Sequence, residues 1–343
     1  MIRTLIIDDS LLFRELLSRG LKDSDDIEVA GHASDPFSAA EQILELEPDV
    51  VTLDVEMPKM DGVKFLRKLM PQYPLPVIVI SSVTSAVFEA LDAGALDFLA
   101  KPIDLSGDMS TFFFSLRSKV RAASQAKFAF RKQISKAINL EQEGLKGEID
   151  PRSIIAIGAS TGGTDAIGSI LTKFTANMPG IVVAQHMPPG FTSLYAERLS
   201  RTTNFDVREA HDGMELVPGR VLIAPGDHHM TVARFEDRYR VNCHRTPKVN
   251  GHRPSVDVLF ESVAASAGAY AIGVILTGMG SDGADGLKKI RDYGGITIGQ
   301  DENTSVVYGM PMAAHMLGGV MIQLPLYRIA DEIFRLLSLS MGR

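Results

Sequence analysis

Residues Ile154-Ile-Ala-Ile-Gly-Ala-Ser160-Thr-Gly-Gly163 run from an apolar stretch into a glycine-rich turn. The apolar part has the composition of a buried strand, and helical spacing follows over 165–174. Glycine permits the tight backbone of a strand-to-helix turn. This order predicts a βα unit of a parallel sheet, with Ser160 at the C-terminal edge of its strand.

Similar units extend the pattern on both sides of Ser160. A first series fills residues 1–104, and a second begins at Ser153, with an antiparallel pattern between Val207 and Cys243. The predicted fold class is α/β, with a doubly wound, flavodoxin-like N-terminal domain and a mainly parallel C-terminal domain that carries an antiparallel portion. The strands expected in the first domain are Ile2–Ile7, Ile27–Ala33, Val50–Leu53, Val77–Ile80 and Leu96–Ala100.

Length and composition favour a soluble protein with two domains. The chain has 343 residues, 45% hydrophobic and 22% charged, and we assign a domain to 1–121, a linker to 122–150 and a domain to 151–343. No apolar run approaches the roughly 20 residues that span a bilayer, so we expect no membrane insertion. The single cysteine, Cys243, excludes an internal disulfide and indicates a cytoplasmic location.

Charge is concentrated in the first domain. Acidic residues outnumber basic ones roughly two to one over 1–104, whereas 151–343 is balanced. Without a uniformly basic surface, nucleic acid is not the expected partner. The acidic residues must be solvated or must bind a cation.

Five polar side chains lie at the C-terminal ends of four of the predicted strands of the first domain. Asp8 and Asp9 end the first strand, Asp54 the third, Ser81 the fourth and Lys101 the fifth. Three carboxylates at one sheet edge raise each other's cost of ionisation, which a divalent cation and an ammonium group would relieve. Asp8 and Asp9 could instead cap the next helix, but this alternative leaves Asp54 and Lys101 unexplained.

Ser160 alone allows several readings. A glycine-rich turn with a serine also occurs in phosphate-binding loops and at helix N-caps. Gly158-x-Ser160-x-Gly162 matches the nucleophile turn of α/β-hydrolases. However, Ser160 follows the first strand of its domain, and the late His315 has the setting of an ordinary helix residue.

A serine nucleophile needs a base and an acid. His186 directly ends the apolar strand 181–185 of the next βα unit. Asp282 lies in the glycine-rich loop 277–283 after the strand 271–276. Three strand ends therefore supply serine, histidine and aspartate at one edge of the sheet, which predicts nucleophilic catalysis.

The acidic constellation resembles that of response-regulator receiver domains, over residues 1 to about 121. The resemblance implies that Asp54 accepts a phosphoryl group from the phosphohistidine of a histidine kinase and that Phe98 is the switch aromatic. The segment between Ser81 and Gly94 is about one helical turn shorter than the family pattern. The remaining implied roles are Mg²⁺ binding by Asp9, the Asp54 carboxylate and the Glu56 carbonyl with Asp8 behind them, and phosphoryl contacts from Ser81 and Lys101.

The second domain resembles the chemotaxis protein-glutamate methylesterases of the CheB family. The resemblance implies a Ser160, His186 and Asp282 triad, with the Met279 backbone N–H in the oxyanion hole and no cofactor for ester hydrolysis. It covers nearly all of residues 151–323. The matching motifs are Gly158–Gly163, Gln185–Phe191, Ile223–Asp227, His252–Asp257 and Ile275–Gly283.

The two resemblances together imply a function. We expect hydrolysis of glutamate γ-methyl esters on methyl-accepting chemotaxis receptors, with methanol released and receptor glutamines also deamidated. Phosphorylation of Asp54 would relieve occlusion of Ser160 by the receiver, and the protein would act as a monomer. The alternative is a receiver-linked adaptor that binds receptors without catalysis.

Overall fold

The structure, a computed structural model, forms two compact units, Met1–Phe128 and Ala129–Arg343. It describes residues 1–57, 60–102, 104, 109–126, 150–175, 177–236 and 238–340. Most of the predicted linker 122–150 therefore lies outside the described residues. The last helix of the first unit ends at Ser124, three residues beyond the predicted boundary at 121.

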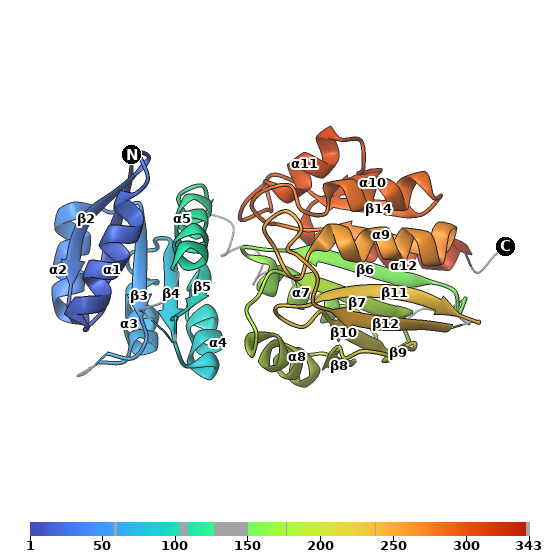
Figure 1. The fold of residues 1–343 in the computed structure, drawn as a ribbon, viewed down its shortest axis with the longest axis horizontal. Coiled ribbons are helices and arrows are strands. Elements are labelled where there is room, and N and C mark those ends of the chain that lie inside the picture. Colours follow the sequence, from blue (N-terminus) through green and yellow to red (C-terminus); the bar gives the residue numbers. More distant parts are fainter. Residues whose placement is uncertain are drawn as a thin grey trace. The chain divides into compact units, whose positions relative to one another are not determined.

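The first unit is a five-stranded parallel sheet with helices on both faces (Figure 1). Its strand order, β2-β1-β3-β4-β5, is the flavodoxin-like order, which confirms the predicted fold. Its elements are β1 (Ile2–Ile7), α1 (Leu11–Lys22), β2 (Ile27–Ala33), α2 (Pro36–Leu46), β3 (Val50–Asp54), α3 (Gly62–Leu69), β4 (Val77–Ser81), α4 (Thr84–Asp92), β5 (Asp97–Ala100) and α5 (Ser110–Ser124).

Side-chain caps define where most of these helices begin. Ser10 Oγ accepts a hydrogen bond from Phe13 N at the start of α1. Asp35 caps α2 and Asp61 caps α3 in the same way. Helix α4 has only nine residues and no side-chain cap.

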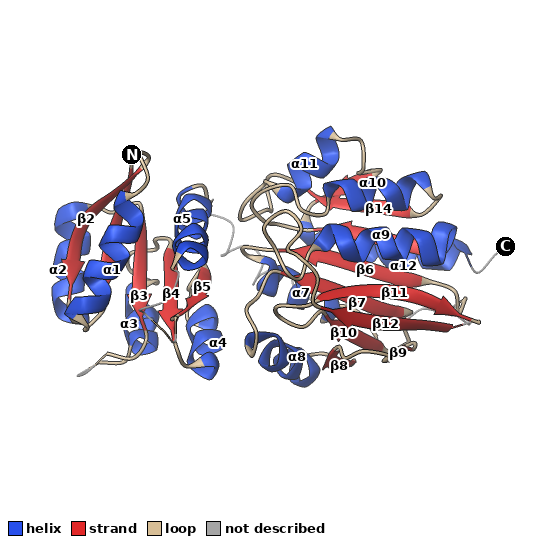
Figure 2. Ribbon diagram, in the orientation of Figure 1, coloured by secondary structure: helices blue, strands red, loops and turns tan. Residues whose placement is uncertain are grey.

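The second unit contains a seven-stranded parallel sheet, with a separate three-stranded antiparallel sheet beside helix α9 (Figure 2). The strand orders are β15-β14-β13-β6-β7-β10-β8 and β11-β12-β9. The elements are β6 (Ile154–Ala159), α7 (Gly163–Leu171), β7 (Gly180–Gln185), α8 (Phe191–Thr202), β8 (Asp206–Glu209), β9 (Glu215–Leu216), β10 (Arg220–Ile223), β11 (His229–Phe235), β12 (Arg238–His244), α9 (Val256–Ala267), η2 (Gly268–Tyr270), β13 (Ala271–Ile275), α10 (Ala284–Asp292), β14 (Ile296–Gln300), α11 (Met310–Met316), β15 (Ile322–Leu324) and α12 (Leu326–Ser340).

The antiparallel pattern predicted between Val207 and Cys243 is only partly present. Strand β8 pairs in parallel with β10, and β10 with β7, so both belong to the main sheet. Among the described strands of this region, β9, β11 and β12 are the antiparallel ones. A short strand's apolar pattern does not specify which neighbour it pairs with, so the partner had to come from the tertiary fold.

Strand β6 lies where the order of the parallel sheet reverses. The chain proceeds from β6 to β7 and β10 on one side, and later returns to β13 and β14 on the other. In open α/β sheets, ligands bind outside the carboxyl ends of the strands at such a switch point. The topology therefore marks the ends of β6, β7 and β13 as the place for a site.

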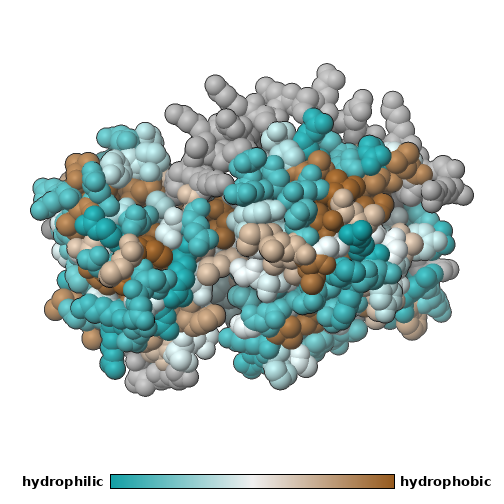
Figure 3. Space-filling view, turned by 90° about the horizontal axis from the view of Figure 1, so that it is seen from above, coloured by the Kyte–Doolittle hydropathy of each residue, from teal (hydrophilic) through white to brown (hydrophobic). Residues whose placement is uncertain are grey.

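Both faces of β6 are buried. Ile154 and Ala156 contribute to a core with Leu259 and Phe260 of α9, and every residue of the strand is buried. Exposed apolar side chains include Met316 and Met321. On the face drawn in Figure 3, brown hydrophobic areas lie among teal hydrophilic ones. Among the described residues, no helix is both long and apolar enough to cross a bilayer.

Candidate functional site

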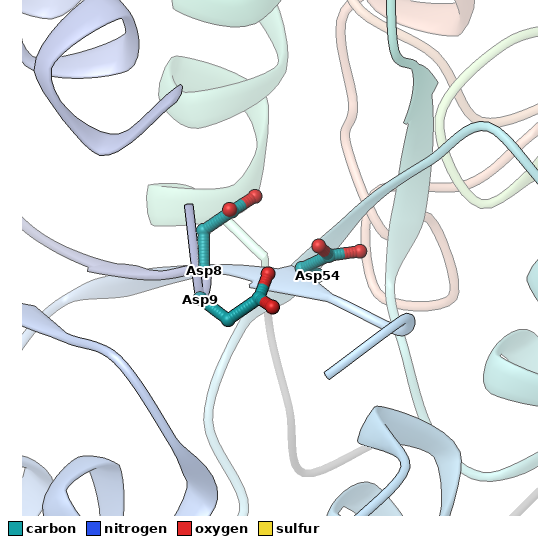
Figure 4. Close-up of side chains that lie close together, drawn as sticks. All are labelled: Asp8, Asp9 and Asp54. Carbon is teal, nitrogen blue, oxygen red and sulfur yellow. The ribbon is translucent and has the colours of Figure 1, made fainter. Parts of the chain in front are cut away.

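In the first unit, three carboxylates meet at the C-terminal edge of the sheet. Strands β1 and β3 are neighbours, and ligand oxygens of Asp8, Asp9 and Asp54 all lie within 4.8 Å of one another (Figure 4). Asp8 and Asp54 are buried, whereas Asp9 is exposed. A compact set of carboxylate oxygens with one open side fits a hard divalent cation such as Mg²⁺.

Lys101 brings a positive charge to this edge. Its Nζ lies 2.6 Å from Asp54 Oδ2 and 2.9 Å from Asp8 Oδ2. Burial raises the pKa of Asp8, with Asp54 adding to the rise, although Lys101 opposes it. Burial by itself would lower the pKa of Lys101, but hydrogen bonds to the two carboxylates raise it above its usual value.

The other predicted receiver residues lie in the loop after β3 and in strands β4 and β5. The Glu56 N–H donates to Asp54 Oδ1 at 3.0 Å, which folds the loop after β3 around Asp54. Ser81 is fully buried at the end of β4, and its Oγ accepts a hydrogen bond from Val83 N at 3.0 Å. Phe98 is buried in β5, with its ring 6.4 Å from that of Phe88.

In the second unit, Ser160 sits in a turn held in place from both neighbouring strands. Its N–H donates to Thr277 O at 3.0 Å, after β13. Its carbonyl accepts from Gly163 N at 2.7 Å and from Gln185 Nε2 at 2.9 Å, at the end of β7. Gly162 has a φ of +77°, a conformation that glycine adopts without strain.

The Ser160 hydroxyl remains available. Among the hydrogen bonds of the described residues, none involves Ser160 Oγ, and the residue is partly exposed. The hydroxyl lies in the turn that leads into helix α7. At the start of a helix, backbone N–H groups and the helix dipole favour negative charge.

His186 lies one register step beyond the last pair of β6 and β7. Ala159 pairs with Gln185, so Ser160 and His186 are the next residues on two adjacent parallel strands. The imidazole Nε2 and Asp282 Oδ2 are 2.8 Å apart, and both side chains are largely buried. His186 Nδ1 is buried and forms no hydrogen bond with any described residue. The pairing with Asp282 therefore leaves Nδ1 as the ring nitrogen that can accept a proton.

Asp282 is surrounded by hydrogen-bond donors from the start of helix α9. Its Oδ2 accepts from Val256 N at 2.7 Å, and its Oδ1 accepts from Ser255 Oγ at 2.7 Å and Asp257 N at 3.2 Å. Burial raises the cost of its charge, but the bonds from His186, Ser255 and Val256 hold the pKa of Asp282 well below its usual range. These donors therefore favour the ionised form of Asp282.

The loop after β13 also offers a free backbone donor. Among the hydrogen bonds of the described residues, none uses the Met279 N–H. The preceding residue must be glycine, because a Cβ at Gly278 would lie 2.7 Å from Ser160 Cβ and would also collide with Met310 Sδ. The loop therefore approaches Ser160 more closely than any side chain at 278 would allow.

Sequence reasoning missed Asn250, and it predicted His252 and Ser255 only as part of a segment that lines the site, with no role assigned. The His252 ring stacks on that of His186, with centroids 3.7 Å apart and planes 5° apart. The amide of Asn250 donates to Asp282 Oδ1 at 3.2 Å and to Asp257 Oδ2 at 2.7 Å. The available signals were the Asn250-Gly251 dipeptide, which indicates a tight turn, and Ser255 ahead of an apolar helix, which indicates an N-cap.

The other histidines considered and the single cysteine have structural roles. His315 is an exposed residue of helix α11, as expected. His229 is fully buried at the start of β11, where its Nδ1 accepts from Ser255 N at 3.2 Å. Cys243 lies in β12 and packs against the core, so neither it nor His229 is a candidate for the chemistry.

Comparison with known proteins identifies relatives over almost the whole chain. Residues 155–333 match the CheB methylesterase family, and residues 4–108 match the response regulator receiver domain. The chain is 51% identical to a protein-glutamate methylesterase/protein-glutamine glutaminase of Syntrophomonas wolfei, over 98% of both chains. It is 46% identical to one from Pseudomonas aeruginosa, over 97% of this chain and 96% of that one.

A solved structure supports the same assignment for the second unit. The CheB methylesterase catalytic domain of Thermotoga maritima is 41% identical, with a TM-score of 0.53, covering 54% of this chain and 98% of that one. The fold and the matches define a methylesterase of the response-regulator class, with a receiver domain and a catalytic domain in one chain. The chain belongs to the CheB methylesterase family.

Proposed function

We propose that the second unit hydrolyses γ-methyl esters of glutamate side chains on methyl-accepting chemotaxis receptors and releases methanol. The names of the relatives, protein-glutamate methylesterase/protein-glutamine glutaminase, support the glutamate ester as the reacting group. The observation that carries the mechanism is the His186–Asp282 hydrogen bond, which leaves Nδ1 of His186 as a buried base at the strand end beside Ser160. Family membership in an enzyme class disfavours the alternative of a non-catalytic adaptor.

The first half of the reaction forms an acyl-enzyme. His186 Nδ1 takes the proton of Ser160 Oγ as the oxygen attacks the ester carbonyl carbon. The carbonyl oxygen becomes negatively charged and accepts a hydrogen bond from the Met279 N–H. Ionised Asp282 stabilises the imidazolium. The tetrahedral species collapses when the imidazolium gives its proton to the departing methoxide, which leaves as methanol.

The second half returns the enzyme to its starting state. His186 Nδ1 removes a proton from water as the water oxygen attacks the acyl carbon. The imidazolium then protonates Ser160 Oγ, and the glutamate side chain is released as a carboxylic acid, which loses its proton to solvent. An amide forms the corresponding tetrahedral species with an amino group in place of methoxide. The imidazolium protonates that group, which leaves as ammonia, so the same residues support glutamine deamidation.

Methanol release from a methylated receptor tests this assignment. We expect Ser160→Ala to lower the rate by about 10³-fold or more, because no other group can form the acyl-enzyme. Ser169→Ala is the matched control, since the Ser169 hydroxyl donates to the Ala166 carbonyl within α7. Ser160→Ala protein that retains hydrolysis would exclude the proposed nucleophile.

The first unit would control this activity through Asp54. A histidine kinase donates the phosphoryl group to the Asp54 carboxylate, with Lys101 Nζ and Ser81 Oγ in contact with its oxygens. Asp9, the Asp54 carboxylate and the Glu56 carbonyl would hold Mg²⁺, with Asp8 behind them, and the ion would supply charge neutralisation. Phosphorylation then shifts the population of the chain toward its active state.

Stimulation by a small phosphodonor tests the control. With Asp54→Ala, we expect no incorporation of phosphate and no rise in methanol release on adding acetyl phosphate and Mg²⁺. Asp25→Asn, an exposed acid in the same unit, should respond like the unmodified protein. A full response from Asp54→Ala would reject Asp54 as the acceptor.

A further inference from the structure

A tight turn formed by residues 249–252 contacts both His186 and Asp282. Val249 and His252 exchange two backbone hydrogen bonds, of 3.1 and 2.9 Å. Between them, Asn250 and Gly251 have φ angles of +52° and +80°. Two successive positive φ angles define a type I′ turn, for which Asn-Gly is the favoured pair.

The side chains of this turn reach both members of the pair. His252 stacks on His186, and the Asn250 amide nitrogen lies 3.2 Å from Asp282 Oδ1. The same nitrogen lies 2.7 Å from Asp257 Oδ2. Both amide hydrogens are thus used by carboxylates. The opposite rotamer would place the amide oxygen against two carboxylates, so the orientation of the amide is determined by its partners.

Asp257 is a buried carboxylate behind Asp282. Its side chain lies in the first turn of α9, is 4% exposed, and accepts a second hydrogen bond from Gly286 N at 2.7 Å. Burial and the nearby charge of Asp282 raise the pKa of Asp257 to about 6. The structure gives it no contact with Ser160 or His186, so it acts on the chemistry only through Asp282.

The donors are divided between the two oxygens of Asp282. Oδ1 accepts from Asn250, Ser255 and Asp257, whereas Oδ2 accepts from Val256 and His186. Losing the Asn250 amide would remove one donor from Oδ1 and leave two carboxylates facing each other without a bridge. Rotation of Asp282 would then misdirect the imidazole, and small misplacements of a catalytic group cost rate steeply.

We propose that Asn250 and Asp257 are positioning residues for the esterase, with the Asn250 amide bridging the two carboxylates so that Asp282 Oδ2 faces His186. This inference rests on the proposed triad. The Asp257 carboxylate orients the amide and adds negative charge behind Asp282. That charge favours the imidazolium form of His186 in the transition state.

Substitutions at residue 250 can separate this role from the shape of the turn. Glycine and aspartate both tolerate the left-handed backbone, so Asn250→Gly and Asn250→Asp keep the turn. We expect Asn250→Gly to lower kcat about 10- to 100-fold with little change in KM. Asn250→Asp should be slower still at pH 8, where it adds a third carboxylate, and should recover relative to Asn250→Gly as the pH falls.

Asp257→Asn tests the second carboxylate through the pH profile. Asp257 is ionised mainly above about pH 6, and its charge favours the imidazolium that forms in the transition state. In Asp257→Asn, kcat should therefore fall above this pH and approach that of the unmodified protein as the pH is lowered. Asp282, Asp285 and Lys289 are the other charged groups that act on Asp257, and all three are kept. In the full-length protein, the low-field proton NMR signal of the His186 Nε2–H should also shift or broaden in this variant.

The outcomes distinguish this inference from the triad itself. Asn242→Asp, which adds the same charge on the exposed face of β12, is the control and should behave as the unmodified protein. If Ser160→Ala is inactive while Asn250→Gly, Asn250→Asp and Asp257→Asn keep the normal kcat, pH profile and low-field signal, the positioning role is wrong and the triad stands. If Ser160→Ala retains activity, the triad is wrong and with it the positioning role.

Discussion

The acidic edge of the first unit and the serine edge of the second unit both bury carboxylates at the C-terminal ends of parallel strands, but they neutralise them differently. Asp8 and Asp54 share the single ammonium group of Lys101. Asp282 instead accepts five hydrogen bonds, three of them from the start of helix α9. In the first arrangement, the carboxylates of Asp8, Asp9 and Asp54 outnumber the ammonium group of Lys101, so negative charge is in excess. In the second, hydrogen-bond donors satisfy both oxygens of an ionised carboxylate.

The two arrangements move carboxylate pKa values in opposite directions. Burial raises the pKa of Asp8 despite Lys101, whereas the donors around Asp282 outweigh its burial and lower its pKa. The comparison shows that burial alone does not decide the ionisation of a side chain. The excess charge of the first edge prepares it for a cation, and the satisfied charge of the second prepares it to hold an imidazolium.

The largest effect should come from removing the charge of Asp282. We expect Asp282→Asn to reduce methanol release by about 10³- to 10⁴-fold, because the amide cannot stabilise the imidazolium and favours the wrong tautomer. Asp285→Asn is the matched control, since Asp285 is exposed on the first turn of α10. Comparable losses of methanol release in the two variants would show that the rate depends on local charge and not on the hydrogen bond between Asp282 and His186.

A smaller loss of activity should follow from adding a side-chain atom at Gly278, next to the turn that holds Ser160. Gly278→Ala places a Cβ against Ser160 and Met310, and we expect about a 10²-fold lower rate because the nucleophile is displaced. Gly168→Ala in α7 has only one neighbour, at 3.8 Å, and should raise stability by about 1 kcal/mol. Kinetics and thermal melting of both variants measure this, and normal kinetics in Gly278→Ala would disprove the close approach.

The acidic edge should gain stability when Asp8 loses its charge. The pKa of Asp8 is raised in the folded state, so its favourable contribution is present below the unfolded pKa and is lost as the pH rises through the folded pKa. At pH 7 without metal, Asp8→Asn should therefore increase the melting temperature of the first unit by a few degrees. Added Mg²⁺ should stabilise the unmodified protein more than the variant. A lower melting temperature for Asp8→Asn in EDTA would contradict the excess charge.

The smallest expected effect concerns Cys243, a third ionisable group whose pKa is shifted by burial. Burial, with Asp212 and Glu209 nearby, raises the pKa of its thiol to about 12. We expect iodoacetamide to leave the folded protein almost unlabelled at pH 8 and to label it fully in denaturant, as read by intact mass. Rapid labelling of the folded chain would show that burial in β12 does not suppress the thiolate.

Much of this arrangement follows from sequence because parallel strands place their ends together. The positions of Ser160, His186 and Asp282 on neighbouring strands required only the order of strands and loops. Their catalytic roles stay predictions. The pairing of β8 with β10 was not evident, because short apolar runs do not encode their partners.

The residues around Asp282 were harder to predict for a different reason. Asn250 lies in an irregular segment between β12 and α9, and its path depends on the elements packed around it. The Asn-Gly dipeptide indicates a turn but not its direction. Asp257 looks in sequence like an ordinary acid in the first turn of a helix, and only the fold shows that it is buried behind another carboxylate.

The orientation of the His186 ring also limits how far from its own backbone the base can act. Nδ1 is bonded to the ring carbon that carries the side chain, so a base acting through Nδ1 works close to its own backbone. The nucleophile must then come from the immediately adjacent strand, as Ser160 does through the register of β6 and β7. Any insertion that slips this register by one residue would carry the serine out of range, so the spacing of two strands is itself part of the catalytic apparatus.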